Sequence, residues 1–437
     1  MSAANPHHTP GRDGHAPSRP RGGRRLAGLA LAVAVASGLV GAAAYASSQG
    51  GATGEPRNGE DLRLDWQARS GGVQVLGGTR DPGTPSVQRI RHDEVDFTVT
   101  VAPARPGPNL VRVDAARISK DGVLRAHGAH GTSGRHRVFV GTRADFDAGR
   151  QVRAETRPGA TGLWAVVDLP EGSGTILVSH GPRHLVPFAV DTGSEPAATE
   201  AWSGPDGPEC ATAATAAVLA GGTAADACPS EGLDDESADA LRRTVDTLVD
   251  RGVEEIAVQR DASPRSAAAY DLVREVADVA GVRVVEPSAA PGARNALLVV
   301  SGWADAATSL TKVTATPLHQ QPIRSDGTWL APWLLTPGVV DSTAGAVLAL
   351  DFDIRDPAAQ VFSQTLVALF PGQSPTSAGY LAWREARGDD PDPLSLYAAS
   401  RAAYMPNQPG HTGHGSEVAW FPGGTVTPVG GISEGTP

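Results

Sequence analysis

An uninterrupted apolar stretch near the N-terminus constrains this 437-residue chain more than any other feature. Residues Leu26–Tyr45 carry no charge, and the preceding RPRGGRR supplies arginines that have no matching cluster on the other side. A helix of about twenty residues rises about 30 Å, the thickness of the hydrocarbon core of a bilayer. Because basic residues stay on the cytoplasmic side, the pattern predicts a transmembrane helix over 26–46 with the bulk of the chain outside.

The same stretch is compatible with a cleaved export signal. Ala44-Tyr45-Ala46, followed by a serine, has the small-residue pattern of a signal-peptidase site. The apolar run exceeds the core of about 7–15 residues in an ordinary signal peptide, which favours a retained anchor. We therefore expect a single-pass protein of the cell membrane with a cytoplasmic N-terminus, and secretion after signal cleavage is the alternative.

The length and the Gly- and Pro-rich joints predict two folded domains beyond the anchor. About 390 residues exceed a single core of usual size. We expect a disordered cytoplasmic tail over 1–25, linkers over 47–65 and 193–209, a β-sandwich over 66–192 and an α/β domain over 210–437.

The first of these domains has the period of β-strands. Val95, Phe97, Val99 and Val101 alternate with polar residues, and turn-forming clusters such as PGPN and EGSG separate further short β-prone runs. About seven short strands spaced in this way predict an antiparallel, Ig-like sandwich.

The segments VTVAPARPGPNLVRVDA, DGV, LWAVVDLPEGSGTILVSHG and PFAVDT resemble the YtkA-like and copper-resistance periplasmic β-sandwich domains. The shared features are mostly turns, above all a Pro-Gly-Pro-Asn turn between two early strands. The resemblance implies a sandwich fold and makes copper handling one functional expectation.

Beyond residue 210 the pattern changes to helices that alternate with strands. Leu241, Val245, Leu248 and Val249 lie on one side of a predicted helix that Gly252 ends. Ser263 and Pro264 predict the start of the next helix, and Gly281 predicts its end. The expected apolar face of that helix consists of Leu272, Val273, Val276 and Val279. Strands are predicted over 253–258, 282–285 and 296–300, which favours a mainly parallel sheet with helices packed on it.

A second resemblance rests on IAVQRDASPRSAAAYDLVREVADVAGVRVVEP, NALLVVSGWADAATSL, GTWLAPWLL, FPGQSPTSAGYLAWREA and EVAWFPGGTVTPVG. In order and spacing these segments resemble type I periplasmic solute-binding proteins of the branched-chain amino-acid kind. The resemblance implies a periplasmic-binding-protein-like fold and a small-molecule solute as ligand. The strands of a first lobe and its serine- and threonine-bearing ligand loop are not found, so the family's two-lobed clamshell is expected to be incomplete.

The sequence contains no H-E-x-x-H motif, no Walker loop, no G-x-G-x-x-G after a strand and no G-x-S-x-G elbow between a strand and a helix, so we expect no enzyme. The net charge of −11 and the absence of clustered arginines with interleaved aromatics beyond the anchor argue against a nucleic-acid partner. Cys210 and Cys228 are the only cysteines. In an exported protein such a pair predicts a disulfide.

Histidines in glycine-rich segments are the candidate metal ligands. His127, His130 and His136 lie in HGAHGTSGRH, and imidazole suits copper and zinc. His411 and His414 lie in a similar segment, HTGHG. For both groups an exposed loop without metal is the alternative, and no other cofactor is expected.

Aromatic residues of the second domain are the candidate solute contacts. Trp329, Trp333, Tyr380 and Trp383 could line a small-molecule cleft, and core packing is the alternative. Asp351 and Asp353 follow a β-prone run and are expected to face the same way, which suits a cation or acid–base chemistry. A solvated strand end is the alternative for this pair.

These observations favour a non-enzymatic, membrane-anchored binding protein that senses or captures a small solute or an envelope partner outside the cytoplasm. Copper handling by the sandwich is the second hypothesis. A structural or assembly role, with a degenerate binding domain, is the third.

Overall fold

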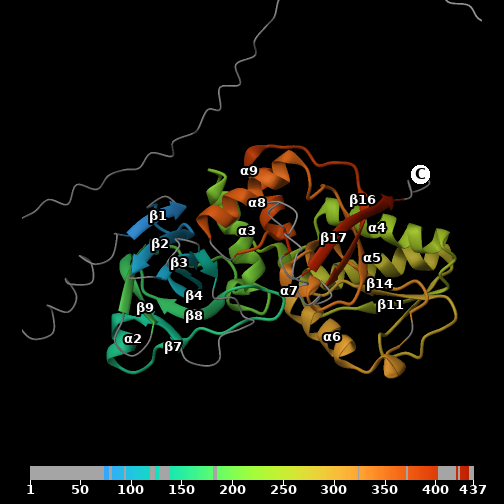
Figure 1. The fold of residues 1–437 in the computed structure, drawn as a ribbon, viewed down its shortest axis with the longest axis horizontal. Coiled ribbons are helices and arrows are strands. Elements are labelled where there is room, and N and C mark those ends of the chain that lie inside the picture. Colours follow the sequence, from blue (N-terminus) through green and yellow to red (C-terminus); the bar gives the residue numbers. More distant parts are fainter. Residues whose placement is uncertain are drawn as a thin grey trace, which may run out of the picture. The chain divides into compact units, whose positions relative to one another are not determined.

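The computed structural model of the protein describes residues 73–77, 81–92, 95–118, 124–126, 137–180, 185–322, 324–370, 373–401, 420–421 and 424–432 (Figure 1). All of them belong to one compact unit, Arg57–Pro437. The predicted tail, membrane helix and first linker, residues 1–65, lie outside the described residues. Within the described ranges, no helix combines the length and the apolar character needed to span a bilayer.

Two antiparallel sheets make up the first half of the described chain. One follows the order β1-β2-β3-β4-β5, and β8 also pairs with β4. The other follows the order β10-β9-β6-β7. The strands of the first sheet are β1 Val73–Gly77, β2 Ser86–His92, β3 Val95–Ala102, β4 Gly107–Ile118, β5 Leu124–Ala126 and β8 Leu163–Leu169. Those of the second are β6 Val138–Thr142, β7 Val152–Arg153, β9 Ser173–His180 and β10 Leu185–Asp191, with a short helix α2 Arg143–Asp147 after β6.

The two sheets share one hydrophobic core. Phe97 and Val113 of the first sheet pack in the same cluster as Val140, Val178 and Phe188 of the second. The predicted two-sheet sandwich is therefore confirmed as an architecture, whereas the Ig-like assignment stays a prediction. The expected alternation along β3 is also present, because Phe97 belongs to this core.

The outer face of the first sheet is buried as well. Thr100 on β3 and Arg112 on β4 point away from the sandwich core and are each only 3% exposed. They lie under helix α3, Gly207–Leu219, with which they line a narrow crevice. One sheet of the sandwich is thus covered on both sides, which explains why its strands bury polar as well as apolar residues.

Helix α3 is a feature that the sequence analysis missed. Every residue from Gly207 to Ala217 is buried. A helix that is apolar or small on all sides shows no stripe, so periodicity does not detect it. It begins inside the predicted linker 193–209, where the turn η1, Ala201–Ser203, also buries Trp202.

The predicted disulfide is confirmed. Cys210 in α3 is bonded to Cys228, with an S–S distance of 2.03 Å, and Cys228 precedes the turn η2, Pro229–Glu231. The bond ties the buried helix to the segment that leads into the α/β half.

The second half is built on a sheet of order β12-β11-β13-β14-β15-β16-β17. The first five strands are parallel, and β16 and β17 are antiparallel to their neighbours. The strands are β11 Glu255–Gln259, β12 Arg283–Val285, β13 Asn295–Val299, β14 Thr328–Leu330, β15 Ala346–Leu350, β16 Ser395–Arg401 and β17 Gly424–Gly431. The helices are α4 Asp235–Asp250, α5 Pro264–Ala280, α6 Trp303–Ala315, α7 Pro337–Val340, α8 Pro357–Leu369 and α9 Ser377–Arg387, with the turns η3 Leu318–Gln320 and η4 Pro332–Leu334.

Local signals placed the ends of α5 correctly. The Ser263 hydroxyl accepts a hydrogen bond from the backbone N–H of Ser266, Pro264 is the first helical residue, and Gly281 ends the helix with φ of 74°. Only glycine adopts such a left-handed cap without a steric cost.

The predicted apolar face of α5 was wrong in part. Val279 is 89% exposed, whereas Ala269, Val273 and Ala277 are completely buried. These three residues are spaced by four, so they lie on one side of the helix, while Val279 lies about a third of a turn away from Val273 around the helix axis. Alanines therefore contribute much of the buried face of α5. A prediction based on the large apolar residues alone placed Val279 on that face by mistake.

Candidate binding edge at the carboxyl ends of the parallel strands

The order of the parallel strands indicates where a ligand would bind in a sheet of this kind. Strand β11 lies between β12 and β13. The chain therefore adds β12 on one side of β11 and then crosses over to add β13 on the other side, which makes a topological switch point. In open α/β sheets, ligands bind outside the carboxyl ends of the strands at such a switch point. Here the residues that follow β11 and β13 are Arg260 to Ser263 and Val300 to Gly302.

Asp261 organises the loop after β11. One carboxylate oxygen accepts hydrogen bonds from the backbone N–H of Ser263, at 2.9 Å, and from its hydroxyl, at 2.6 Å. The other accepts from the backbone N–H of Gly302, at 2.6 Å, at the start of α6. Burial alone would raise the pKa of Asp261, but these hydrogen bonds outweigh it and hold the pKa below its usual value. Asp261 therefore remains an anion that joins the ends of β11 and β13.

A second carboxylate reaches this edge from outside the α/β sheet. Asp206 is the N-cap residue of α3, but its side chain makes no capping hydrogen bond to that helix. It lies instead against Gly302, where an added Cβ would overlap its carboxyl group. The backbone N–H of Ala304, in the first turn of α6, donates a hydrogen bond to it.

The surroundings of Asp206 disfavour its charge. Burial is the largest cause, the nearby carboxylates of Glu209 and Asp261 add to it, and together they raise the pKa of Asp206 to about 6. Arg265 and the Ala304 N–H act in the opposite direction without cancelling the effect. One oxygen of the Asp206 carboxyl is buried without a hydrogen-bond partner.

The one arginine in this cluster is already engaged. Both terminal nitrogens of Arg265 donate to the carboxylate of Glu209, each at 2.7 Å, and the two side chains are 3% and 0% exposed. The guanidinium carbon also lies 4.4 Å from the centre of the Trp333 ring. Such a bidentate pair fixes the position of α3 against α5, because neither charge can be left alone in the interior.

Two tryptophans close the edge on the side of β13 and β14. The indole N–H of Trp303 donates to the carbonyl of Trp333 at 2.8 Å, and the indole N–H of Trp333 donates to the carbonyl of Ser301 at 2.9 Å. Both rings are buried. Trp333, a predicted solute contact, therefore lies near the switch point, with its one polar group bonded within the protein.

A loop of the sandwich covers the same edge. The hydroxyl of Thr336 donates to the carbonyl of Gly159 at 2.7 Å, and Arg157 donates to the carbonyl of Gly204 at 2.6 Å. Gly159 has φ of 76°, and a Cβ there would overlap the backbone of Trp303. The switch point is thus filled by groups of the chain itself.

The other aromatic candidates are core residues. Trp329, Tyr380 and Trp383 are 2%, 4% and 6% exposed. Tyr380 and Trp383 pack in a cluster of rings with Phe362, at centroid distances of 5.7 and 5.6 Å. Contact of these residues with a solute stays a prediction.

Asp351 and Asp353 do not form a free pair of carboxylates. Asp351 is paired with Arg384 at 2.5 Å. Asp353 is paired with Arg355, whose guanidinium lowers the pKa of that carboxyl. Both residues follow the last residue of β15, Leu350, and each has its own arginine. This arrangement leaves little reason to assign them acid–base chemistry.

The predicted metal ligands lie outside the described residues. This holds for His127, His130 and His136, and for His411 and His414. Among the residues that the structure does describe, no group of three or more histidine, cysteine, aspartate or glutamate side chains is placed to hold a metal ion. Copper binding therefore stays a prediction.

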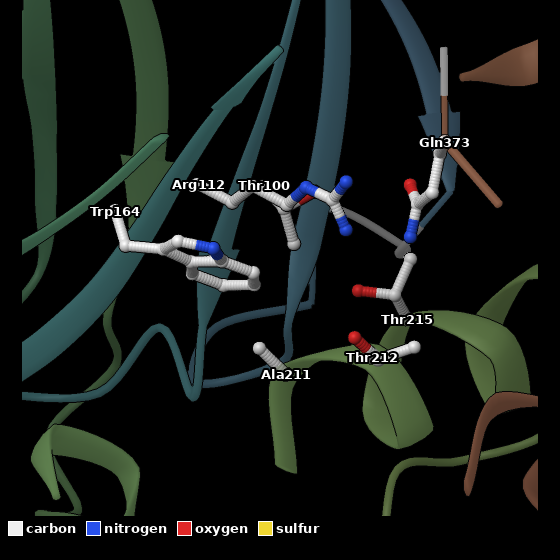
Figure 2. A pocket seen from close by; sticks show the side chains of 7 residues that line it. All are labelled: Thr100, Arg112, Trp164, Ala211, Thr212, Thr215 and Gln373. Carbon is white, nitrogen blue, oxygen red and sulfur yellow. The ribbon is translucent and has the colours of Figure 1, made fainter. Parts of the chain in front are cut away.

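A crevice lies where the sandwich meets α3 (Figure 2). Its lining consists of Thr100, Arg112, Trp164, Ala211, Thr212, Thr215 and Gln373. The crevice has essentially no room even for a water molecule, whereas small-molecule sites measure about 300–1,000 Å³. The guanidinium of Arg112, which Figure 2 shows reaching into the crevice, is bonded to Asp114 at 2.6 Å and to Thr161 at 3.0 Å. This crevice is too small for an organic solute.

The sequence analysis missed Asp206, Glu209 and Arg265. Glu209 offered the one usable signal, because an acidic residue at the start of an alanine-rich apolar segment needs a buried partner. The identity of that partner depends on folding, since Arg265 is 56 residues away in the chain.

No family model matches this chain. No curated protein matches it either. Solved structures with partial likeness are periplasmic solute-binding proteins of ABC transporters. A substrate-binding protein of Desulfitobacterium hafniense in complex with Leu is 14% identical, over 38% of this chain and 63% of that one, with a TM-score of 0.26.

Two further structures give similar figures. A branched-chain amino acid ABC transporter ligand-binding protein of Burkholderia xenovorans is 11% identical, over 44% of this chain and 63% of that one, with a TM-score of 0.29. A periplasmic binding protein of Burkholderia mallei is 13% identical, over 45% and 63%, with a TM-score of 0.30. This chain therefore spans less than two thirds of each of these structures. The resemblance of the first half to YtkA-like domains stays a prediction.

Proposed function

We propose that this protein is a non-enzymatic binding protein of the cell envelope that recognises a partner protein on its outer surface and does not enclose a small solute. In this proposal the segment 26–46 anchors the chain, and the sandwich and the α/β half lie outside the cytoplasm.

The observation that carries the proposal is the filled switch point. Asp206, the paired tryptophans and the loop around Gly159 occupy the edge where a sheet of this order would take a ligand. The crevice under α3 has essentially no room for a solute. Because neither the switch point nor the crevice has room for a solute, we expect the protein to bind a partner through its exposed surface.

A ligand screen and a crosslinking experiment test this together. Melting of the full chain in detergent is followed with amino acids, small organic acids and sugars, and no shift is expected. A photo-crosslinking residue is then placed at Val279, Val361 or Val429, which are 89%, 51% and 57% exposed on α5, α8 and β17. If the protein binds one specific partner, one crosslinked product of defined size should form in intact cells. It should form from one of the three positions and not from all of them. Stabilisation by a solute, or adducts of equal pattern from every site, would contradict the proposal.

The membrane topology is tested separately by cysteine labelling. Asp168 is exposed on β8, so the variant D168C is expected to react with a membrane-impermeant maleimide in intact cells. The variant S18C, in the predicted cytoplasmic tail, is expected to react only after lysis. Labelling of S18C in intact cells would rule out the proposed orientation.

A further inference from the structure

The junction between the sandwich and the α/β half contains an unbalanced group of charges. Asp206 and Glu209 come from the start of α3, while Asp261 and Arg265 come from the loop after β11 and from α5. Arg265 is the cation that acts most strongly on Asp206, and both of its terminal nitrogens are bonded to Glu209. Asp206 therefore lies beside two carboxylates without a salt bridge of its own.

Asp206 lies in a segment that contacts both the sandwich and the start of α6. Its segment also carries Gly204, which accepts a hydrogen bond from Arg157 of the sandwich, and Cys210, which is fixed by the disulfide. Its side chain is turned away from its own helix and contacts the start of α6 at Gly302 and Ala304. One carboxyl group thus connects the segment entering α3 to the switch point of the sheet.

We infer that Asp206 is a proton-controlled latch, which holds the segment entering α3 on the start of α6 more tightly when its carboxyl group is neutral. The neutral carboxyl keeps a carbonyl oxygen for the Ala304 N–H and loses the repulsion from Glu209 and Asp261. The latch is independent of the partner that the protein binds, so its failure would leave the proposed function standing.

The sign of the pH dependence follows from linkage. Asp206 has a pKa of about 6 when the latch is closed and an ordinary value near 3.8 when it is open and solvated. The closed form therefore binds more protons between these values, and it loses stability as the pH rises towards 6. Above that pH the penalty is constant. For a closed-state value about two units above the open one, moving from about pH 7.5 to about pH 5 favours closure by roughly tenfold.

Hydrogen exchange of the full chain measures this equilibrium. After correction for intrinsic exchange rates, amides at the start of α6 and over 203–209 should gain roughly tenfold protection between about pH 7.5 and about pH 5. The variant D206N mimics the neutral carboxyl and should be strongly protected at both values. The control D168N makes the same change at an exposed aspartate and should keep the response of the wild type.

The exchange behaviour of the wild type and of D206N distinguishes a latch from a carboxyl group without this role. A wild type without this pH response, or a D206N variant that retains it, would overturn the latch. Failure of D206N to fold would also overturn it, because the neutral side chain should be the better tolerated one at neutral pH. A loss of the response in D206N alone would support it.

Discussion

Gly302, at the switch point, is needed because it has no side chain. Gly302 has an ordinary extended backbone, so it is required for space and not for conformation. An added methyl group there would overlap the carboxyl group of Asp206. The contact between α6 and the start of α3 therefore depends on a glycine that no turn motif demands.

We expect the variant G302A to lose about 1–3 kcal/mol of stability, the usual cost of forcing an extra methyl into a packed site. The variant G345A is the matched control, because nothing lies within 4 Å of a Cβ at Gly345. In a D206A background the penalty of G302A should largely disappear, since the overlapping group is gone. Urea unfolding of the four variants and the wild type measures the coupling, and equal penalties in both backgrounds would refute the contact.

The buried ion pair of Glu209 and Arg265 should also be sensitive to single substitutions. Removal of one partner, as in R265M, leaves a fully buried carboxylate and should cost about 3–5 kcal/mol. The double variant E209M/R265M should be considerably less destabilised, because no charge is left alone. Thermal melting compares the wild type, E209M, R265M and the double variant. If the double variant were as unstable as the sum of the single ones, the two groups would not be a pair.

At the scale of elements, α3 is the unit that joins the two halves. It covers the outer face of the first sheet of the sandwich, contacts α9 and carries one half of the disulfide. A helix packed on every side gains its stability from its neighbours, since its own sequence has no amphipathic character. Anything that loosens its end should therefore affect both halves.

Reduction of the disulfide should lower the free energy of unfolding by about 3 kcal/mol on the chain-entropy model, for cysteines 18 residues apart. Equilibrium unfolding with and without a reductant measures the effect. The variant C210A/C228A provides the control, because the reductant should leave its stability unchanged. No difference between oxidised and reduced wild type would mean that the bond constrains nothing in the unfolded chain.

For the whole molecule, continuous packing predicts cooperative unfolding. Residues 57–437 form one compact unit, and the outer face of the sandwich is shared with α3. Two domains joined by a flexible linker would instead unfold independently.

Two core substitutions test this cooperativity. Phe188 lies in the sandwich core and Phe362 in the α/β core, and both are essentially inaccessible to solvent. F188A and F362A should each cost about 3–5 kcal/mol and lower the midpoint of one common transition. Calorimetry and tryptophan fluorescence follow it. Two transitions, or a shift confined to the half that carries the substitution, would show independent domains.

Features that depend on near neighbours in the chain could be predicted from the residues alone. Alternating residues predicted the strand Val95–Ala102, caps predicted both ends of α5, and two cysteines in an exported chain predicted their bond. These signals are local or compositional, because they arise from backbone conformation and from the number of available partners.

Which distant groups come into contact could not be predicted, because it depends on how the whole chain packs. Tertiary packing selected the alanine face of α5 over Val279, buried α3 between the two halves and brought Asp206 beside Gly302, which lies almost a hundred residues further along the chain. The physical reason is that burial and charge repulsion depend on what surrounds a side chain in space. The carboxylates of Asp206 and Asp261 repel each other only after folding has brought the start of α3 against the loop after β11.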